Sequence, residues 1–194
     1  MPKRILILQG HPDASAPHFC HALADAYAGG AIEGGHEVRR ISLAHLDFPV
    51  LRDPAEWRNG AVAPAIAKCQ DDIRWAEHLV IVYPLWLGSM PALLKAFFEQ
   101  VARPGFAVRE GKGGAPEPLL KGKSARIVVT MGMPAFLYRW YYRAHSLRSL
   151  ERNVLAVAGI RPVRESLVGP VEAMSDARRQ DWRFKLRDLG RQAR

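Results

Sequence analysis

The alternation of hydrophobic and polar positions divides the chain into strands and helices that follow one another in turn. Aliphatic runs that stop at a glycine or a proline predict three buried strands, at 4–10, 78–84 and 125–132. Two more segments mix apolar with polar residues and predict less buried strands, at 36–43 and 161–169. Apolar residues three and four positions apart predict helices over 18–35, 63–77, 90–102, 136–159 and 176–194.

Strands that alternate with helices predict a parallel sheet covered by helices on both faces. Five strands in this sequence fit an α/β, flavodoxin-like architecture with the strand order 2-1-3-4-5. No internal repeat or shift in composition marks a boundary, so residues 1–194 are predicted to form a single domain. In such a sheet, ligands bind beyond the carboxyl ends of the strands, where the strand order reverses. That rule selects three loops, at 9–20, 84–91 and 131–145.

The composition is compatible with one core and no membrane segment. With 48% hydrophobic residues, 194 residues can bury a sizeable core. The sequence contains no uncharged apolar run of about 18 residues, and its first apolar run is too short for a signal peptide. Two cysteines, Cys20 and Cys69, provide neither a disulfide framework nor paired metal spacing. We therefore expect a cytoplasmic protein without a metal. A zinc site at His18, Cys20 and His21 is disfavoured, because three residues in one helical turn cannot face one metal ion well.

The excess of basic residues leaves two kinds of anionic partner open. Twenty-eight Lys and Arg against nineteen Asp and Glu give a net charge of +9, which attracts polyanions and also small anions such as a phosphorylated dinucleotide. The arginines are spread out, with one concentration in 176–194, where Trp182, Leu186 and Leu189 recur at helical spacing. This pattern is typical of a solvated helix, so nucleic acid is not the expected partner. A module that binds nucleic acid or an anionic membrane stays an alternative, which a steep salt dependence would reveal.

The first loop, QGHPDASAPHFC, leads directly into a helix. Free N–H groups at a helix start suit a phosphate or pyrophosphate, and His11, His18 and Ser15 could add donors. The loop is neither a Walker A motif nor a GxGxxG motif. Ordinary capping of the helix by Ser15 or Asp13 is the alternative.

The second loop offers flat apolar contact followed by a glycine. Gly88 permits close approach of the backbone, and aromatic or apolar surface beside exposed amides suits a planar heteroaromatic ring. The apolar residues are Pro84, Leu85, Trp86 and Leu87. Packing of Trp86 in the core or at a dimer contact is the alternative.

The third loop brings hydroxyl, phenol and imidazole groups to the same edge of the sheet. Such groups can hydrogen-bond a ring or take up charge as electrons arrive. The candidates are Thr130, Gly132, Tyr138, Tyr141, Tyr142 and His145.

Four blocks of the sequence resemble the flavin-dependent NAD(P)H:quinone oxidoreductases. In chain order they read ILILQGHP…HFCHAL, YPLWLGSMPALLKAFFEQV, PGFAV…LLKGK and VVTMGMP…Y…H. The resemblance runs from about Lys3 to Gly169, and the PLWLGSMPALLK block is its most specific part. It implies a flavin cofactor, FAD in the first place with FMN possible, and NAD(P)H as electron donor.

The resemblance also implies a role for each matching residue. His11, Ser15, His18, Phe19 and Cys20 would hold the phosphate or pyrophosphate. Pro84, Leu85, Trp86, Leu87 and Gly88 would lie along the isoalloxazine, with Thr130, Met131 and Gly132 at its pyrimidine side. Tyr138 and His145 look like the family's catalytic pair, with Tyr141 or Tyr142 as alternatives for the tyrosine. The substrate pocket would include Phe106, Tyr141 and Tyr142.

The implied reaction is a two-electron reduction of a quinone or related acceptor by a ping-pong mechanism. The implied site lies at a homodimer interface, with Phe106 or Tyr142 supplied by the partner subunit and 106–121 as a flap over the site. A flavin-binding regulatory subunit with incidental reductase activity is the alternative. The sequence leaves the natural acceptor and the choice between NADH and NADPH open.

Overall fold

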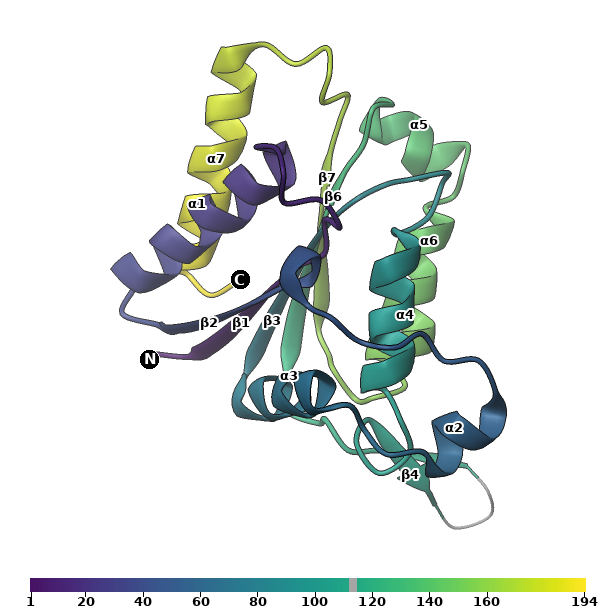
Figure 1. Ribbon diagram of the computed structural model, residues 1–194. Coiled ribbons are helices and arrows are strands. Elements are labelled where there is room, and N and C mark those ends of the chain that lie inside the picture. Colours follow the sequence, from purple (N-terminus) through teal and green to yellow (C-terminus); the bar gives the residue numbers. More distant parts are fainter. Residues whose placement is uncertain (112–114) are drawn as a thin grey trace.

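Five parallel strands form one sheet between two layers of helices in the computed structural model, which describes residues 1–111 and 115–194 (Figure 1). The spatial order is β2-β1-β3-β6-β7, which is the predicted 2-1-3-4-5 order once a separate two-stranded hairpin is set aside. The strands of the sheet are β1 (Arg4–Gln9), β2 (Glu37–Ser42), β3 (His78–Pro84), β6 (Ser124–Thr130) and β7 (Val163–Val168). The predicted fold class is therefore confirmed.

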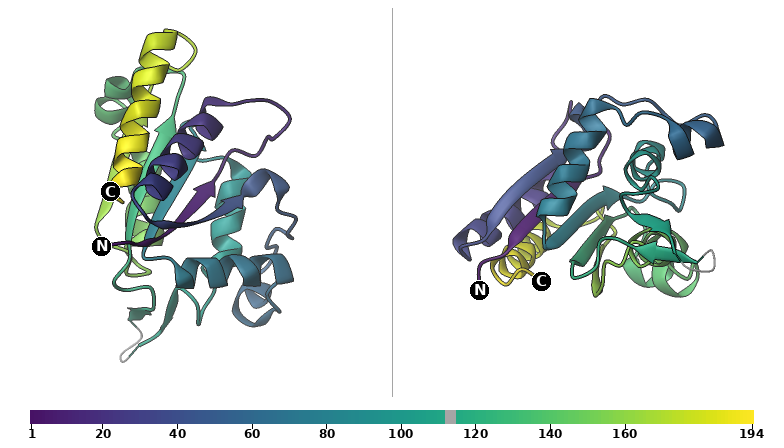
Figure 2. Two further views of the ribbon diagram at one scale, coloured as in Figure 1. Left: turned by 90° about the vertical axis from the view of Figure 1, so that its left-hand side faces the viewer. Right: turned by 90° about the horizontal axis from the view of Figure 1, so that it is seen from below.

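Strand β1 shows why helices cover both faces of the sheet. Its side chains alternate, so Ile5 and Ile7 join one core while Leu6 and Leu8 join the other. The first core is closed by α1 (Phe19–Glu33) and α7 (Asp176–Arg191), and the second by helices that include α3 (Pro64–Trp75) and α4 (Ala92–Val101). Figure 2 shows the two layers from the side and from below. An aliphatic run without polar residues is what a strand buried on both faces requires.

The predicted helical region 136–159 is interrupted. It forms α5 (Ala135–Trp140), α6 (His145–Ser149) and a π-helical segment, η3 (Leu150–Leu155). Between α5 and α6, Arg143 and Ala144 have φ angles of 52° and 50°. These left-handed conformations cannot continue a right-handed helix, so the chain changes direction there. Two other short segments lie earlier in the chain, η1 (Leu43–His45) and α2 (Pro54–Asn59).

The glycine-rich segment after α4 does not lie over the carboxyl ends of the strands. It forms the hairpin of β4 (Val108–Glu110) and β5 (Pro116–Pro118) near the amino ends of the sheet strands (Figure 1). Phe106 is buried in the core, with the guanidinium of Arg74 4.8 Å from its ring centre. Within one chain, the predictions of a flap over 106–121 and of Phe106 in the substrate pocket are therefore wrong, because the Phe106 side chain is packed in the core. Residues 112–114 of the predicted flap lie outside the described residues.

None of the helices in the described part of the chain combines the length and the apolar character needed to cross a membrane.

Candidate functional site

The three predicted loops leave the sheet side by side at its carboxyl edge. Backbone hydrogen bonds continue past the strand ends, from Gly10 N–H to Val82 O (2.7 Å) and from Leu85 N–H to Thr130 O (2.7 Å). A third bond runs from the N–H of Met131 to a carbonyl of β7 (2.9 Å). The loops after β1, β3 and β6 therefore start from fixed, adjacent positions at the edge where the topology predicts a ligand site.

Asp13 organises the first loop. Its carboxylate accepts bonds from the N–H and hydroxyl of Ser15 (2.7 and 2.6 Å) and lies 2.7 Å from Nε2 of His18. The Ser15 hydrogen bonds, followed by the His18 contact, hold the pKa of Asp13 well below its usual range. In this structure the Ser15 hydroxyl thus donates to Asp13, and the predicted use of Ser15 for a phosphate is an untested role.

The start of α1 is not capped by a side chain. His18 is the N-cap residue, and its side chain makes no capping bond. Among the described residues, the N–H groups of Phe19 and Cys20 have no hydrogen-bond acceptor. Capping by Ser15 or Asp13, the alternative from the sequence, is therefore wrong. Two free donors at the positive end of a helix suit a phosphate group.

Three imidazoles gather beside this helix start. The rings of His11 and His18 are stacked, with centroids 3.7 Å apart, and both meet the ring of His21 edge-on at about 5.5 Å. Burial, and then the neighbouring His18, lower the pKa values of His11 and His21. An anion bound here would favour the protonated imidazoles and be stabilised by them. His21 belongs to this group although it was considered from the sequence only as a zinc ligand.

The second loop is a tight turn whose tip is a fully exposed leucine. Trp86 and Ser89 exchange both backbone hydrogen bonds, at 2.8 and 2.9 Å. Leu87 and Gly88 between them have φ angles of 48° and 78°, which glycine adopts freely and leucine does not. Trp86 is 47% exposed and its indole meets His11 edge-on at 5.6 Å, so it is not a core residue. An exposed apolar residue in a strained backbone conformation, as at Leu87, is a feature of binding sites.

We expect Leu87→Asn to raise the free energy of unfolding by about 1 kcal/mol, because asparagine tolerates the left-handed conformation and the lost side chain buries nothing. Urea denaturation of the two proteins without ligand measures this change. A matched substitution, Leu85→Asn, alters a half-buried residue on the same loop and should lower stability instead. An unchanged or lower stability of Leu87→Asn would show that the turn is not strained.

The end of β6 and the loop after it are buried against the start of α1. The thiol of Cys20 lies 3.0 Å from the hydroxyl of Thr130, and both are buried. Burial raises the pKa of the Cys20 thiol to about 12, which favours the protonated thiol. Met131 is also buried, while a Cβ on Gly132 would lie 2.9 Å from a carboxylate oxygen of Glu172. Glu172 could not be predicted as part of the site, because it reaches the loop from beyond β7.

Tyr138 is a core residue. Its side chain is 1% exposed, and its hydroxyl accepts a hydrogen bond from the N–H of Leu147 (3.2 Å). Burial raises its pKa. His145 is exposed, and no hydrogen bond joins it to Tyr138 among the residues described. In this structure α5 turns the phenol of Tyr138 into the core and away from the exposed His145, and the catalytic pair implied by the resemblance stays a prediction.

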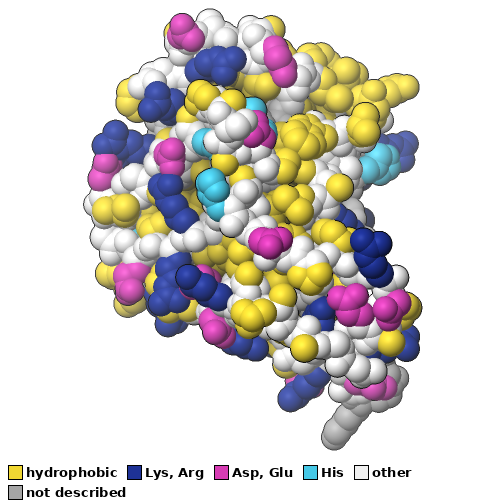
Figure 3. All heavy atoms as spheres, viewed as in Figure 1, with side chains coloured by type: hydrophobic (Ala, Val, Ile, Leu, Met, Phe, Trp, Pro, Cys, Tyr) yellow, Lys and Arg dark blue, Asp and Glu magenta, His cyan; other side chains and the backbone are white. Residues whose placement is uncertain are grey.

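The two alternative tyrosines lie on the surface. Tyr141 and Tyr142 are 75% and 42% exposed, and their rings meet edge-on with centroids 4.9 Å apart. They continue an apolar surface over α5, visible at the upper right of Figure 3. We call this surface the α5 patch; it consists of Phe136, Leu137, Trp140, Tyr141 and Tyr142. A patch of this kind on a protein surface is a typical feature of interfaces and ligand sites.

In the described ranges, 1–111 and 115–194, no three His, Cys, Asp or Glu side chains are placed to hold a metal ion. The chemistry that the site offers is thus the binding of a phosphate by free N–H groups and imidazoles, next to an apolar surface for a flat ring.

Comparisons with known proteins agree with the fold. Residues 3–189 match the family described as having a flavodoxin-like fold. An uncharacterized NAD(P)H oxidoreductase of Haemophilus influenzae is 29% identical over 90% of this chain and 88% of its own length. An FMN-dependent NADH:quinone oxidoreductase of Burkholderia pseudomallei is 36% identical over 47% of this chain and 48% of its own length.

Solved structures show the same fold. An NAD(P)H:quinone oxidoreductase from Methanothermobacter marburgensis superposes with a TM-score of 0.86 and 21% identity, over all of both chains. Smu.1420 from Streptococcus mutans superposes with a TM-score of 0.78 and 26% identity, over 97% of this chain and 99% of the other.

Proposed function

Because the chain belongs to the flavodoxin-like fold family, we propose that it is a flavin-dependent NAD(P)H oxidoreductase that reduces quinones or related acceptors. The observation that carries this proposal is the uncapped start of α1 beside the exposed turn at Trp86 and Leu87. The free N–H groups at the start of α1 suit the phosphate of a flavin, and the exposed turn suits its ring. Relatives with this function are named FMN-dependent, so we propose FMN in place of the FAD expected first from the sequence.

The residues of this chain would divide the work among three loops. The N–H groups of Phe19 and Cys20, with the imidazoles of His11 and His18, would bind the phosphate. The backbone from Pro84 to Gly88 and the side of Trp86 would bind the ring, and the backbone of 130–132 would bind its other edge. A flavin in this position supplies the chemistry, by taking a hydride from a nicotinamide and passing two electrons to the acceptor. His145 would hold a proton for the acceptor.

An anaerobic absorbance titration tests the proposal. We expect the purified chain to bind FMN, the flavin bands to bleach on addition of NADH or NADPH, and the bands to return on addition of menadione. Steady-state rates at several concentrations of both substrates should give parallel double-reciprocal lines, as ping-pong kinetics require. FMN that binds without bleaching would favour a regulatory subunit, and no binding of FMN or FAD would contradict the proposal.

We also propose that the site is completed in a homodimer, through the α5 patch. Trp140 and Tyr141, which are 78% and 75% exposed in the loop region after β6, argue for an apolar partner surface. Tyr142 of a second copy could then line the substrate pocket, whereas Phe106 is fixed in the core of its own chain.

Trp140→Glu should convert a dimer to a monomer without unfolding it, because a carboxylate at the centre of an apolar interface is left without a partner. Sedimentation velocity of the two proteins measures the change. The control is Phe184→Glu, which places the same charge on an exposed aromatic of α7. A wild-type protein that sediments as a monomer would contradict the dimer.

A further inference from the structure

The carboxylate of Glu172 lies against the backbone of the third loop. Glu172 belongs to the connection from β7 to α7, at the carboxyl edge of the sheet (Figure 1). Gly132 has no side chain that would keep this carboxylate away. A Cβ on Gly132 would lie 2.9 Å from one carboxylate oxygen and 3.4 Å from the other. The negative charge therefore lies directly beside the backbone of Gly132.

Hydrogen bonds fix the connection between β7 and α7 in this place. The N–H of Met131 donates to the carbonyl of Val168 (2.9 Å), and the N–H of Val171 donates to the carbonyl of Met131 (3.0 Å). From α7, the guanidinium of Arg179 donates to the carbonyls of Val171 (2.5 Å) and Met174 (3.3 Å). The backbone next to Glu172 is thus anchored to the third loop on one side and to α7 on the other.

The charge of Glu172 is unpaired in the described part of the chain. No Lys, Arg or His nitrogen of residues 1–111 and 115–194 lies within 4.0 Å of its carboxylate. The guanidinium of Arg179, on the adjacent helix, donates to carbonyl groups instead. Asp13 in the first loop differs, because Ser15 and His18 contact its carboxylate. Glu172 therefore adds an uncompensated negative charge beside the third loop.

A negative charge at this place would act on a flavin. In the proposed function, the backbone of 130–132 binds one edge of the flavin ring, and two electrons taken up by the ring add negative charge to it. A nearby carboxylate repels that charge and disfavours the reduced state relative to the oxidised state. Glu172 is exposed, so water and salt weaken this repulsion.

We propose that Glu172 lowers the reduction potential of the bound flavin and makes the reduced enzyme a stronger electron donor to its acceptor. The inference rests on the proposed function, since it needs a flavin beside Gly132. The role is electrostatic, and Glu172 transfers no proton and forms no bond. The same charge opposes reduction by NAD(P)H, so Glu172 should change the rates of the two half-reactions in opposite directions.

Glu172→Gln tests the proposal, because it keeps the shape of the side chain and removes its charge. The potential of the bound FMN is measured at equilibrium with a redox dye. We expect the variant to bind reduced FMN about tenfold more tightly relative to oxidised FMN, which raises the two-electron potential by about 30 mV. Glu172→Asp keeps the charge and should shift the potential less, whereas Glu172→Lys should raise it further. In about 1 M salt these differences should shrink, because the Debye length falls to about 3 Å.

Glu110 provides the matched control. It is an exposed glutamate of β4, near the amino ends of the sheet strands and thus at the opposite edge of the sheet from Gly132. Glu110→Gln removes the same charge and should leave the potential unchanged. Stopped-flow absorbance gives a second readout, because Glu172→Gln should speed reduction of the flavin by NADH and slow its reoxidation by menadione. A variant with a damaged site would slow both.

Equal potentials of the wild type and Glu172→Gln would overturn the proposal, and so would equal shifts in Glu172→Gln and Glu110→Gln. The potential is measured without turnover, so these results differ from failure of the proposed function. A chain that NADH reduces, but whose potential ignores Glu172→Gln, would contradict the role of Glu172 alone. A chain whose potential shifts as expected, but that NADH does not reduce, would support that role and contradict the reductase. A chain that binds no flavin would contradict both.

Discussion

Gly30→Ala is expected to lower the free energy of unfolding by about 3 kcal/mol or more, because there is no room for a methyl group where α1 crosses α7. A Cβ at Gly30 would lie 1.8 Å from the carbonyl oxygen of Arg187, and one at Gly190 would lie 2.1 Å from the carbonyl oxygen of Tyr27. The obstacles are backbone atoms of a neighbouring helix, so rotation of a side chain cannot relieve the overlap. The two helices would have to move apart and open the core that they share with β1.

The adjacent glycine is the matched control. Gly29 lies in the same helix, and a Cβ there would meet nothing within 4 Å. Gly29→Ala should therefore stabilise the protein by about 1 kcal/mol through helix propensity alone. Thermal or urea denaturation followed by circular dichroism compares the three proteins. Similar stabilities of the two variants would mean that α1 and α7 do not pack through Gly30.

The sheet could be predicted from the sequence because its signal is local. The runs at Ile5–Leu8 and Leu79–Tyr83 contain no polar residue, and strands with this composition are stable only between two covering layers. Alternation with helices then fixes a parallel order that few topologies satisfy. The positions of the three loops followed from the same rule, since loops at the carboxyl edge are a property of the sheet and not of their own residues.

The orientation of individual side chains could not be predicted in this way. Tyr138 points into the core because α5 ends at Trp140 and the chain turns through left-handed residues at Arg143 and Ala144. Neither residue is a glycine, so the sequence has no sign of the turn. Phe106 is a second case, because a glycine-rich segment with prolines was interpreted as a flap although its apolar residues are needed in the core.

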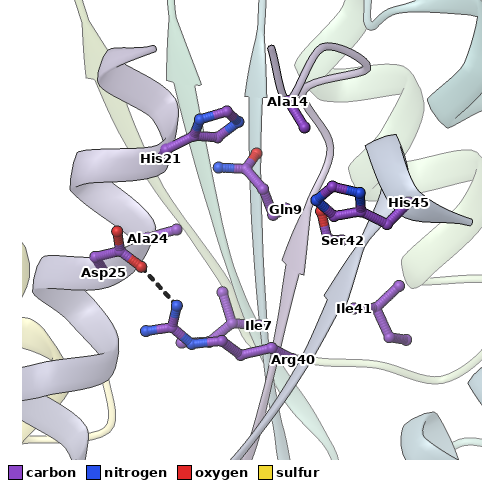
Figure 4. A pocket seen from close by; sticks show the side chains of 10 residues that line it. All are labelled: Ile7, Gln9, Ala14, His21, Ala24, Asp25, Arg40, Ile41, Ser42 and His45. Carbon is purple, nitrogen blue, oxygen red and sulfur yellow. Dashed lines mark hydrogen bonds and ion pairs between the residues drawn. The ribbon is translucent and has the colours of Figure 1, made fainter. Parts of the chain in front are cut away.

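A pocket between α1 and the carboxyl ends of β1 and β2 (Figure 4) was not predicted from the sequence, for a different reason. Gln9 ends β1 and His45 follows β2, and the two meet only because these strands are neighbours in the sheet. The predicted strand order contained that information. The strand order was used only to select the three loops around the switch point, and the residues after β2 were not considered as part of a site.

His145→Gln is expected to slow reoxidation of the reduced flavin by menadione about 100-fold, because a positioned acid or base contributes about that factor or more. Reduction of the flavin by NADH should change little, since the hydride carries no proton from the protein. Stopped-flow absorbance measures the two half-reactions separately. The FMN dissociation constant of the variant serves as the control for an intact site.

Tyr138→Phe should lower the stability and leave both half-reactions unchanged, although the resemblance to quinone oxidoreductases assigns the phenol to catalysis. Its hydroxyl is buried and accepts the N–H of Leu147, so its removal leaves a buried donor unpaired and should lower the free energy of unfolding by about 1–3 kcal/mol. Both half-reactions should keep their rates. If reoxidation instead slows while stability is unchanged, the phenol must reach the flavin in the working enzyme. Tyr141→Phe and Tyr142→Phe then test the two alternatives. A loss of reoxidation rate in one of these variants alone would make that tyrosine the partner of His145.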